Sequence, residues 1–287
     1  MANGLKIVFP LTTASYAQQF PQGANVPLAT MAVAVKVASA MIAQWCNAEF
    51  YARRYVENYG GRRNNELVLR NRMLVQLNSI VSWPDSSNPT TYTASSFDIW
   101  YGAARLAFKP TVTGAFFDSF DAMQVMPNQG RNAIQADYLA GYGFATALSA
   151  TIAPGANVAL PLAATTGYVQ DQGQWDATNS SYLVLGSGTP QAEVVSVTSS
   201  AGTITAANVA YAHPLADAVS GGIYADDVQM ACCFLAYNLL NIGDLTKKME
   251  AVGHLSGYTQ QLRDPKGNNV FTDDIKAMLM LYKETPA

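Results

Sequence analysis

The chain has 287 residues, of which 49% are apolar and only 13% are charged, and its formal net charge at pH 7 is −3. Charged residues make up about 25% of an average globular domain, and a subunit that buries its exterior in neighbours can replace them with small and amide side chains. The negative charge argues against a general affinity for nucleic acid, and a chain of this length can bury a core without disulfides or metals.

An extended segment and one long helix are predicted at the N-terminal end. Residues 1–25 are predicted to form an extended arm because prolines and a glycine interrupt any regular element. From Leu28 to about Arg53, apolar residues recur at helical spacing. The apolar run Pro27–Trp45 contains Lys36, which favours a packed helix over a membrane span. No signal peptide is expected, because no basic region followed by an apolar core opens the chain.

A β-hairpin rich in arginine is predicted next. Its strands are Arg54–Tyr59 and Glu66–Leu69, joined by a turn-rich segment of glycine, arginine and asparagine. Six arginines fall in this part of the chain: Arg53, Arg54, Arg62, Arg63, Arg70 and Arg72. They form either a solvated surface or a contact with acidic partners or DNA phosphates, both of which guanidinium binds bidentately. The candidate contact residues are Arg53, Arg54, Arg62 and Arg63.

Further strands lead into an inserted β domain, predicted over residues 149–224. The strands before it are Leu74–Val81, Phe97–Trp100, Arg105–Phe108 and Ala133–Tyr138. Near Leu148 the composition shifts to Thr, Ser, Gly and Val, which indicates a separate module. Its predicted strands are Tyr182–Leu185, Glu193–Thr198 and Thr203–Thr205, with Ser199–Gly202 as the turn between the last two.

Acidic residues dominate the second half of the chain. No Lys or Arg occurs between Arg131 and Lys247. The same stretch carries eight carboxylates: Asp137, Asp171, Asp176, Glu193, Asp217, Asp226, Asp227 and Asp244. We therefore expect one face of an assembled particle to be basic and another to be acidic.

Two helices are predicted near the C-terminus. Asp226 and Asp227 are suitable N-terminal caps for the first helix, which has an apolar stripe. The second begins at Thr272 and carries its own apolar stripe: Ile275, Met278, Leu279 and Tyr282. A terminal amphipathic helix usually docks on its own core, and the alternative is that it docks on a partner protein.

Signatures of catalysis are missing. The sequence has neither a G-x-x-x-x-G-K-[ST] phosphate loop nor a G-x-S-x-G nucleophile elbow. His213 and His254 are the two histidines, and no acid or cysteine spacing beside them indicates a metal site. Asp171 and Asp176 fit no calcium loop. The three cysteines have no ligand spacing and are interpreted as small apolar residues in a reducing cytoplasm. We therefore expect no catalytic, cofactor or metal residues.

A family resemblance rests on the order of several segments. These are residues 47–54, 66–69, 73–81, 132–142, 225–232, 248–253 and 271–282. Their apolar patterning and their Gly and Tyr positions resemble the head–tail connector (adaptor) family of tailed bacteriophages, over about residues 26–143 and 225–282. The resemblance implies a helical-bundle host with a β-hairpin, a dodecameric ring below the portal, portal binding through the C-terminal region, and no catalysis.

The resulting expectation is an α+β chain whose helical-bundle adaptor domain, residues 26–148 and 225–287, is interrupted by a small all-β domain. It would extend the DNA channel at the head–tail junction of a virion, after assembly in the host cytoplasm. Its partners would be portal protein, a downstream tail or neck protein and, as passing cargo, double-stranded DNA, with no membrane. The expected portal-binding residues are Phe271, Ile275, Met278, Leu279 and Tyr282. The alternative is a tail component with a carbohydrate-binding or glycan-hydrolysing β module that uses the region of Trp175 and Tyr182. It needs exposed aromatic residues, so burial of Trp175 and Tyr168 would remove it.

Overall fold

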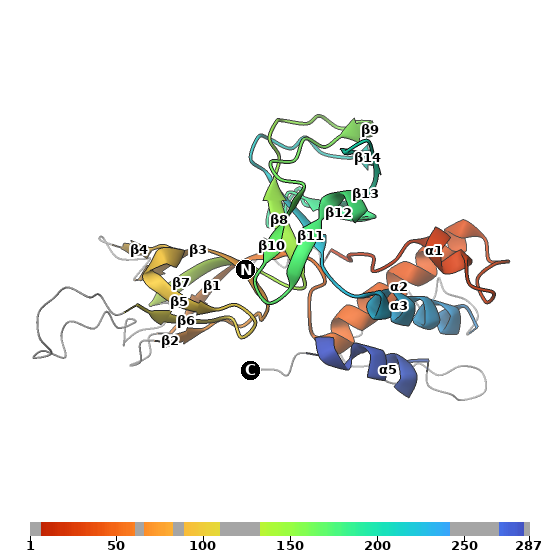
Figure 1. Cartoon of the computed structure of the whole chain (residues 1–287), viewed down its shortest axis with the longest axis horizontal. Coiled ribbons are helices and arrows are strands. Elements are labelled where there is room, and N and C mark those ends of the chain that lie inside the picture. The colour runs from red at the N-terminus through yellow and green to blue at the C-terminus, as the bar shows by residue number, and fades with distance from the viewer. Residues whose placement is uncertain (1–6, 61–65, 83–88, 110–132, 242–269, 284–287) are drawn as a thin grey trace, which may run out of the picture.

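Three lobes, each around its own apolar core, make up the computed structural model, which describes residues 7–60, 66–82, 89–109, 133–241 and 270–283. A helical lobe and a β-sandwich lie at opposite ends, and a β-barrel stands between them (Figure 1). The chain visits the helical lobe first, then the sandwich and the barrel, and then returns to the helical lobe.

Long apolar faces hold the helical lobe together. Its four described α-helices are α1 (Ala14–Gln18), α2 (Leu28–Cys46), α3 (Asp226–Leu240) and α5 (Asp273–Leu279), and the 3₁₀ turn η4 (Met280–Tyr282) follows α5. By length and composition α2 alone among the described helices could cross a membrane. However, Met31, Ala38 and Ile42 are fully buried on the face of α2 that packs in the shared core of the lobe. In the structure α2 is therefore a helix packed in the core of this lobe, as predicted.

Two antiparallel sheets form the sandwich. The first has the order β1-β7-β3-β4 and the second the order β2-β6-β5. Their strands are β1 (Arg53–Tyr59), β2 (Glu66–Val68), β3 (Leu74–Ser82), β4 (Thr90–Tyr92), β5 (Phe97–Trp100), β6 (Arg105–Phe108) and β7 (Ile134–Ala140), with the 3₁₀ turn η1 (Ala94–Ser96) before β5. Inward residues such as Leu74, Ile80 and Leu106 are buried in one core between the sheets.

The barrel is a six-stranded sheet that closes on itself. Its strands are β8 (Gly143–Ala147), β9 (Gly155–Ala159), β12 (Tyr182–Leu185), β13 (Glu193–Ser200), β14 (Thr203–Val209) and β15 (Ala218–Gly222), in the order β8-β15-β12-β13-β14-β9. After β9 the chain returns to β8, where Leu148 pairs with Leu162 and Ala163 N–H donates to the Ala147 carbonyl at 2.8 Å. These contacts bring the two ends of the sheet together. A separate hairpin, β10 (Thr166–Val169) and β11 (Gly173–Asp176), and the 3₁₀ turn η3 (Ala177–Asn179) lie beside the barrel.

The predicted fold class is wrong. The described chain is mainly β, with four sheets, and the helices form one lobe of three rather than a bundle that hosts a small insert. The cause is the region around residues 53–140, where the strands belong to a complete sandwich with its own core. Apolar alternation predicted these strands individually, but it did not indicate that they bury a core of their own.

The predicted hairpin is also wrong. Arg54–Tyr59 lies in β1, which pairs with β7, whereas Glu66–Leu69 contains β2, which pairs with β6 in the other sheet. By contrast, the turn predicted between β13 and β14 is confirmed, because Ser200 pairs with Thr203 across the two-residue turn Ala201–Gly202. Both turn residues have positive φ, as type I′ hairpin turns require.

Two predictions for the helical lobe need correction. The N-terminal arm is not wholly extended: α1 forms within it, and Phe9, Leu11 and Ala17 are buried in the helical core. The N-terminal cap of α3 is Ala225, so Asp226 and Asp227 instead occupy the first turn, where carboxylates favour the helix dipole.

Candidate functional site

The three lobes meet at one junction, where the chain passes between lobes three times. Tyr142 N–H, between sandwich and barrel, donates to the Glu49 carbonyl at 2.8 Å, where the chain leaves the helical lobe. Ile223 N–H, between barrel and helical lobe, donates to the Tyr142 carbonyl at 3.1 Å. Backbone hydrogen bonds therefore join the three crossing segments to one another and fix the lobes at their common base.

Glycines allow these segments to approach closely. A Cβ on Gly141, whose φ is +130°, would lie 2.3 Å from the Tyr51 carbonyl oxygen. A Cβ on Gly143 would lie 2.2 Å from the Gly221 carbonyl oxygen. Real Cβ atoms do not approach backbone oxygens this closely, so the crossing has room only for glycine at these two positions.

An aromatic cluster surrounds the crossing. The Phe50 ring centroid lies 5.7 Å from that of Tyr142, 5.9 Å from that of Tyr224 and 5.8 Å from that of Tyr282. The Tyr282 hydroxyl also accepts a hydrogen bond from Ala225 N–H at 3.2 Å. Each lobe boundary contributes a ring, so the cluster resists rotation of one lobe against another.

Above the junction lies a cleft of about 850 Å³, which we call the junction cleft. The N-terminal segment and the start of α3 form one wall, and the β10–β11 hairpin with the chain up to Tyr182 forms the other. Its polar lining residues are Thr12, Thr13, Thr166, Gln174, Asp176, Asn179, Ser180, Ser181 and Gln229. Its aromatic lining residues are Phe9, Tyr16, Phe144, Tyr168, Trp175, Tyr182 and Tyr224. None of the described lining residues is Lys or Arg, and the lining that the structure describes carries a carboxylate, which disfavours phosphate and other anions.

A stack of two rings between two glycines fixes the hairpin wall. Trp175 stacks on Phe144 with ring centroids 4.2 Å apart and planes 2° apart. A Cβ on Gly167, the cross-strand partner of Trp175, would lie 2.7 Å from its indole Nε1, and one on Gly221 would lie 2.5 Å from the Phe144 ring. Trp175 and Phe144 therefore each have a glycine against one face and the other ring against the opposite face. Tyr168 of the same wall is 64% exposed and presents an open aromatic ring.

The hairpin also reaches the sandwich. Asp171, at the turn, accepts a hydrogen bond from Gly102 N–H at 2.9 Å, and Gln172 Nε2 donates to the Gly141 carbonyl at 2.9 Å. The hairpin thus connects barrel, junction and sandwich, which indicates that the cleft wall is held in one position.

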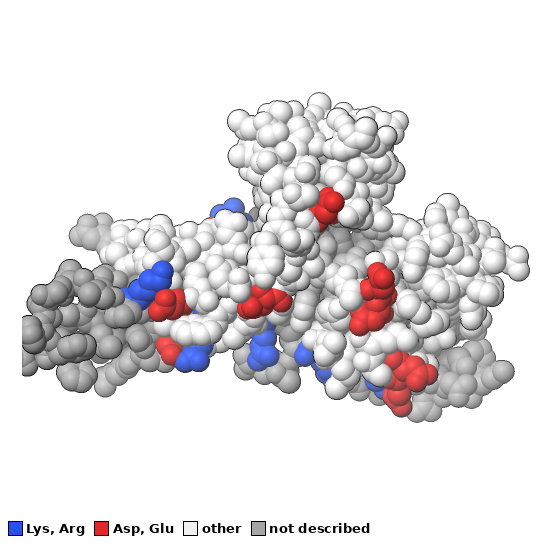
Figure 2. Space-filling view, viewed as in Figure 1, with Lys and Arg blue, Asp and Glu red and all other residues white. Residues whose placement is uncertain are grey.

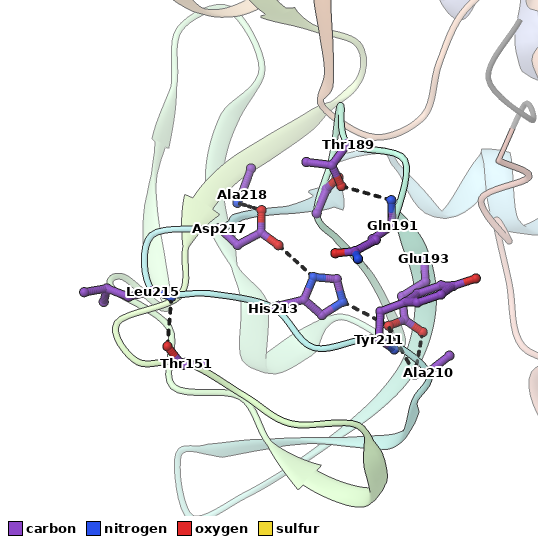
Figure 3. Close-up of polar contacts among 11 residues, drawn as sticks. Thr151, Thr189, Gln191, Glu193, Ala210, Tyr211, His213, Leu215, Asp217 and Ala218 are labelled. Atoms are coloured by element: carbon purple, nitrogen blue, oxygen red, sulfur yellow. Dashed lines mark hydrogen bonds and ion pairs between the residues drawn. The ribbon is translucent and has the colours of Figure 1, made fainter. Parts of the chain in front are cut away.

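A buried polar cluster lies inside the barrel (Figure 3). His213 is fully buried; its Nδ1 lies 2.7 Å from Asp217 Oδ2 and its Nε2 lies 3.0 Å from Glu193 Oε1. Each contact is a hydrogen bond when either the ring nitrogen or the facing carboxyl oxygen carries the shared proton. Glu193 also accepts from the Ala210 and Tyr211 backbone N–H groups. Because no ring atom of His213 reaches solvent, this cluster stabilises the barrel and offers no accessible base. No group of three or more potential metal ligands occurs among the described residues.

Of the four predicted arginine contacts, two lie within the described chain and are already paired. Arg53 Nη1 lies 3.1 Å from Glu49 Oε1. Arg54 binds both oxygens of Asp137, at 2.9 and 2.6 Å. Arg62 and Arg63 lie outside the described residues. The Glu49 and Asp137 carboxylates therefore neutralise much of the positive charge with which Arg53 and Arg54 could bind a phosphate.

The predicted portal-binding residues divide into two groups. Phe271, Ile275 and Leu279 are at most 2% exposed and belong to the core of the helical lobe. Met278 is partly buried and packs against that core, as does Tyr282 at the junction. The exposed apolar side chains at this end of the chain are Met280 and Leu281, at 61% and 85%.

The junction residues were not predicted from the sequence, although a local pattern of glycines beside aromatic residues marks them. Gly141 and Gly143 flank Tyr142, and Gly221 and Gly222 precede Ile223 and Tyr224, so both crossings combine glycine with an aromatic residue. The three cysteines were predicted to be small apolar residues, and Cys46, Cys232 and Cys233 are buried and form no disulfide. Burial raises the pKa of Cys232 to about 12. No protein-family model matches the chain, and no curated protein is significantly similar to it.

Proposed function

We propose that this chain is a structural subunit of a multi-copy assembly, and specifically the head-to-tail adaptor that forms a ring below the portal of a tailed bacteriophage. The observation that carries the proposal is that every lobe exposes large apolar side chains. They are Leu28, Met280 and Leu281 on the helical lobe, Val56, Val68 and Trp100 on the sandwich, and Tyr168, Tyr211 and Leu215 on the barrel. A chain with only 13% charged residues has few groups to keep such surfaces apart in solution.

Charge and rigidity support the same proposal. Figure 2 shows a barrel surface almost without charged side chains, whereas acidic and basic groups gather below it on the other two lobes. The junction holds the three lobes at fixed angles, which suits a subunit whose neighbours must repeat at a constant rotation. The portal and ring assignments come from the resemblance of the sequence to the connector family.

The contact with portal belongs, in this proposal, to the 3₁₀ turn η4 directly after α5. Met280 and Leu281 can reach a partner without any change of fold, whereas Phe271, Ile275 and Leu279 could do so only if α5 left its core. The other expected partners are a downstream tail or neck protein and passing DNA, and Arg53 and Arg54 would act in packing rather than in holding phosphates.

Electron microscopy of the purified full chain, alone and mixed with portal protein, tests the proposal. A closed ring with a central hole, stacked on the portal in the mixture, is the expected result. Met280→Ser together with Leu281→Ser should abolish stacking while leaving the ring, and Leu28→Ser, equally a loss of an exposed side chain, should leave both. A monomer at micromolar concentration that ignores portal would contradict the proposal.

A second candidate is a glycan-binding module, and exposed Tyr168 beside polar groups of the junction cleft favours it. Sugars stack on open aromatic faces, but both faces of Trp175 are covered by Phe144 and Gly167. One open ring makes this the weaker candidate. Saturation-transfer NMR with neutral oligosaccharides would favour it if transfer disappeared in Tyr168→Ala.

A further inference from the structure

The outer face of the β2-β6-β5 sheet carries a compact patch with the composition of an interface centre. Arg105 pairs across the strands with both Val68 and Trp100, so the three side chains lie in one row. Val68 is 46% exposed and Trp100 is 47% exposed. The Arg105 guanidinium lies 5.2 Å from the Trp100 ring centroid, and Glu66 binds it from the other side. Tryptophan and arginine dominate the residues that carry binding energy in protein interfaces. We call this row the Trp100 patch.

The lobe that carries the patch differs in charge from the walls of the junction cleft. The described sandwich residues include six Lys or Arg and four Asp or Glu. The barrel, residues 143–222, has four carboxylates and no Lys or Arg. The cleft lining includes Asp176, and exposed Asp226 lies between the lining residues Tyr224 and Gln229 in sequence. The described sandwich has two more cations than carboxylates, and the described cleft lining has a carboxylate and no cation, so the two surfaces are modestly complementary in charge. This difference favours patch-to-cleft over patch-to-patch encounters.

The chemistry of the cleft also fits this occupant. Its open Tyr168 ring can stack on an indole or a guanidinium, and its amide and hydroxyl groups can accept N–H donors. Among the described lining residues, nucleic acid would meet a carboxylate and no cation.

We infer that the Trp100 patch of one subunit docks in the junction cleft of the next, and this inference rests on the proposed assembly function. The two surfaces lie on different lobes of the same chain, so the contact is head-to-tail and leaves a free patch and a free cleft on every pair. Such contacts close into a ring when the rotation per subunit divides a full turn. The rigid junction sets that rotation.

Sedimentation velocity of the full chain gives the first test. Trp100→Ser and Tyr168→Ala should each weaken subunit association by about 30-fold or more, as loss of a central interface residue does. Their combination should weaken it by less than the product of the single effects, because both remove one contact. Val56→Ser, which removes an equally exposed side chain from the other sheet of the sandwich, is the matched control and should have little effect. Far-ultraviolet circular dichroism should be unchanged in all variants, because these side chains are largely exposed.

Cross-linking tests the pairing itself. A chain carrying both Trp100→Cys and Tyr168→Cys should form a covalent ladder with a short thiol-specific cross-linker. Either substitution alone should give no ladder, and a mixture of the two single variants should stop at dimers. Normal ring formation by Trp100→Ser and Tyr168→Ala would overturn the inference and leave the assembly function standing. A ring of the double-cysteine variant that gives no covalent ladder would do the same. A parent chain that never associates overturns both.

Discussion

The barrel and the sandwich each hold a largely buried glutamate, and they satisfy it in different ways. In the barrel, Glu193 faces His213, whose other ring nitrogen faces Asp217. In the sandwich, Glu57 Oε2 accepts hydrogen bonds from the hydroxyls of Tyr59, at 2.6 Å, and Tyr138, at 2.7 Å. In the sandwich, Glu57 keeps one tyrosine hydroxyl if the other is lost. In the barrel, backbone N–H groups also bind Glu193, but both carboxyl groups share the single side chain His213.

The largest effect is expected from removing that residue. His213→Leu leaves the Glu193 and Asp217 carboxyl groups, 13% and 11% exposed, without the imidazole that contacts both. Leaving a buried polar group without its partner costs about 1–3 kcal/mol, so with two such groups the free energy of unfolding in urea should fall by about 2–6 kcal/mol. Leu215→Ala, two residues away on the surface, is the control, with a change within about 0.5 kcal/mol. Equal stability of His213→Leu and the parent would show that the cluster does not hold the barrel.

A smaller loss is expected in the sandwich. Tyr138→Phe removes a donor to Glu57 and an acceptor for Asn71 Nδ2 at 2.9 Å, while Tyr59 still reaches the carboxylate. Burial raises the pKa of Tyr138 to about 12, so its hydroxyl remains a donor at neutral pH. The expected cost is about 1–3 kcal/mol, measured by the same denaturation. Tyr55→Phe removes the hydroxyl of the ring stacked on Tyr138 and should lower the free energy of unfolding by less. A larger loss in Tyr55→Phe than in Tyr138→Phe would refute the role given to the Tyr138 hydroxyl.

The attachment of the barrel hairpin can be tested through its glycine. Gly167→Ala places a methyl group 2.7 Å from Trp175 Nε1, and overpacking of this kind costs about 1–3 kcal/mol. In a Trp175→Ala background the same substitution should cost much less, because the indole that it meets is gone. Thermal unfolding of the four proteins measures the coupling, and additive losses would show that Gly167 is needed for another reason.

The smallest expected effect is the pH dependence of the Arg54–Asp137 pair in the sandwich. Burial raises the pKa of Asp137, but the Arg54 and Asn78 hydrogen bonds and the Arg54 charge outweigh it, so the folded-state pKa lies below its usual value. The pair therefore stabilises the fold above the unfolded pKa of about 3.9, and this contribution is lost as pH falls through the lower folded pKa. Since Arg54 is half exposed, the contribution should stay under about 1 kcal/mol. In Asp137→Asn the free energy of unfolding should therefore fall less steeply as the pH is lowered into the acid range. An unchanged pH dependence in this variant would contradict the role given to the pair.

Local patterning predicted much of the secondary structure. The apolar stripe and capping residue of α5 were found because Thr272 accepts a hydrogen bond from Ile275 N–H within four residues. The β13–β14 hairpin was found because its turn chemistry lies between its strands. In both cases the residues that interact are close in sequence.

Pairing over long sequence distances was not predictable in the same way. Arg53 of β1 pairs with Ala140 of β7, and no local pattern distinguishes that partner from the nearer Glu66–Val68 strand. The sandwich was therefore mistaken for a hairpin on a helical host. The candidate surfaces failed for a related reason: the stripe of Phe271, Ile275 and Leu279 was correct as a stripe, but sequence alone left open whether the chain itself would cover it.

By itself the sequence determined α2, α3, α5 and several of the strands, the low charge, the acidic second half and the absence of familiar catalytic motifs, because these follow from composition and from neighbours along the chain. Only the tertiary structure decided that the chain crosses itself at Gly141, Gly143 and Gly222, that Trp175 is half-buried between Phe144 and Gly167 while Tyr168 is open, and that His213 lies between two carboxyl groups. Each of these depends on segments far apart in sequence meeting at a few ångströms, where a single Cβ or a single charge decides whether they fit.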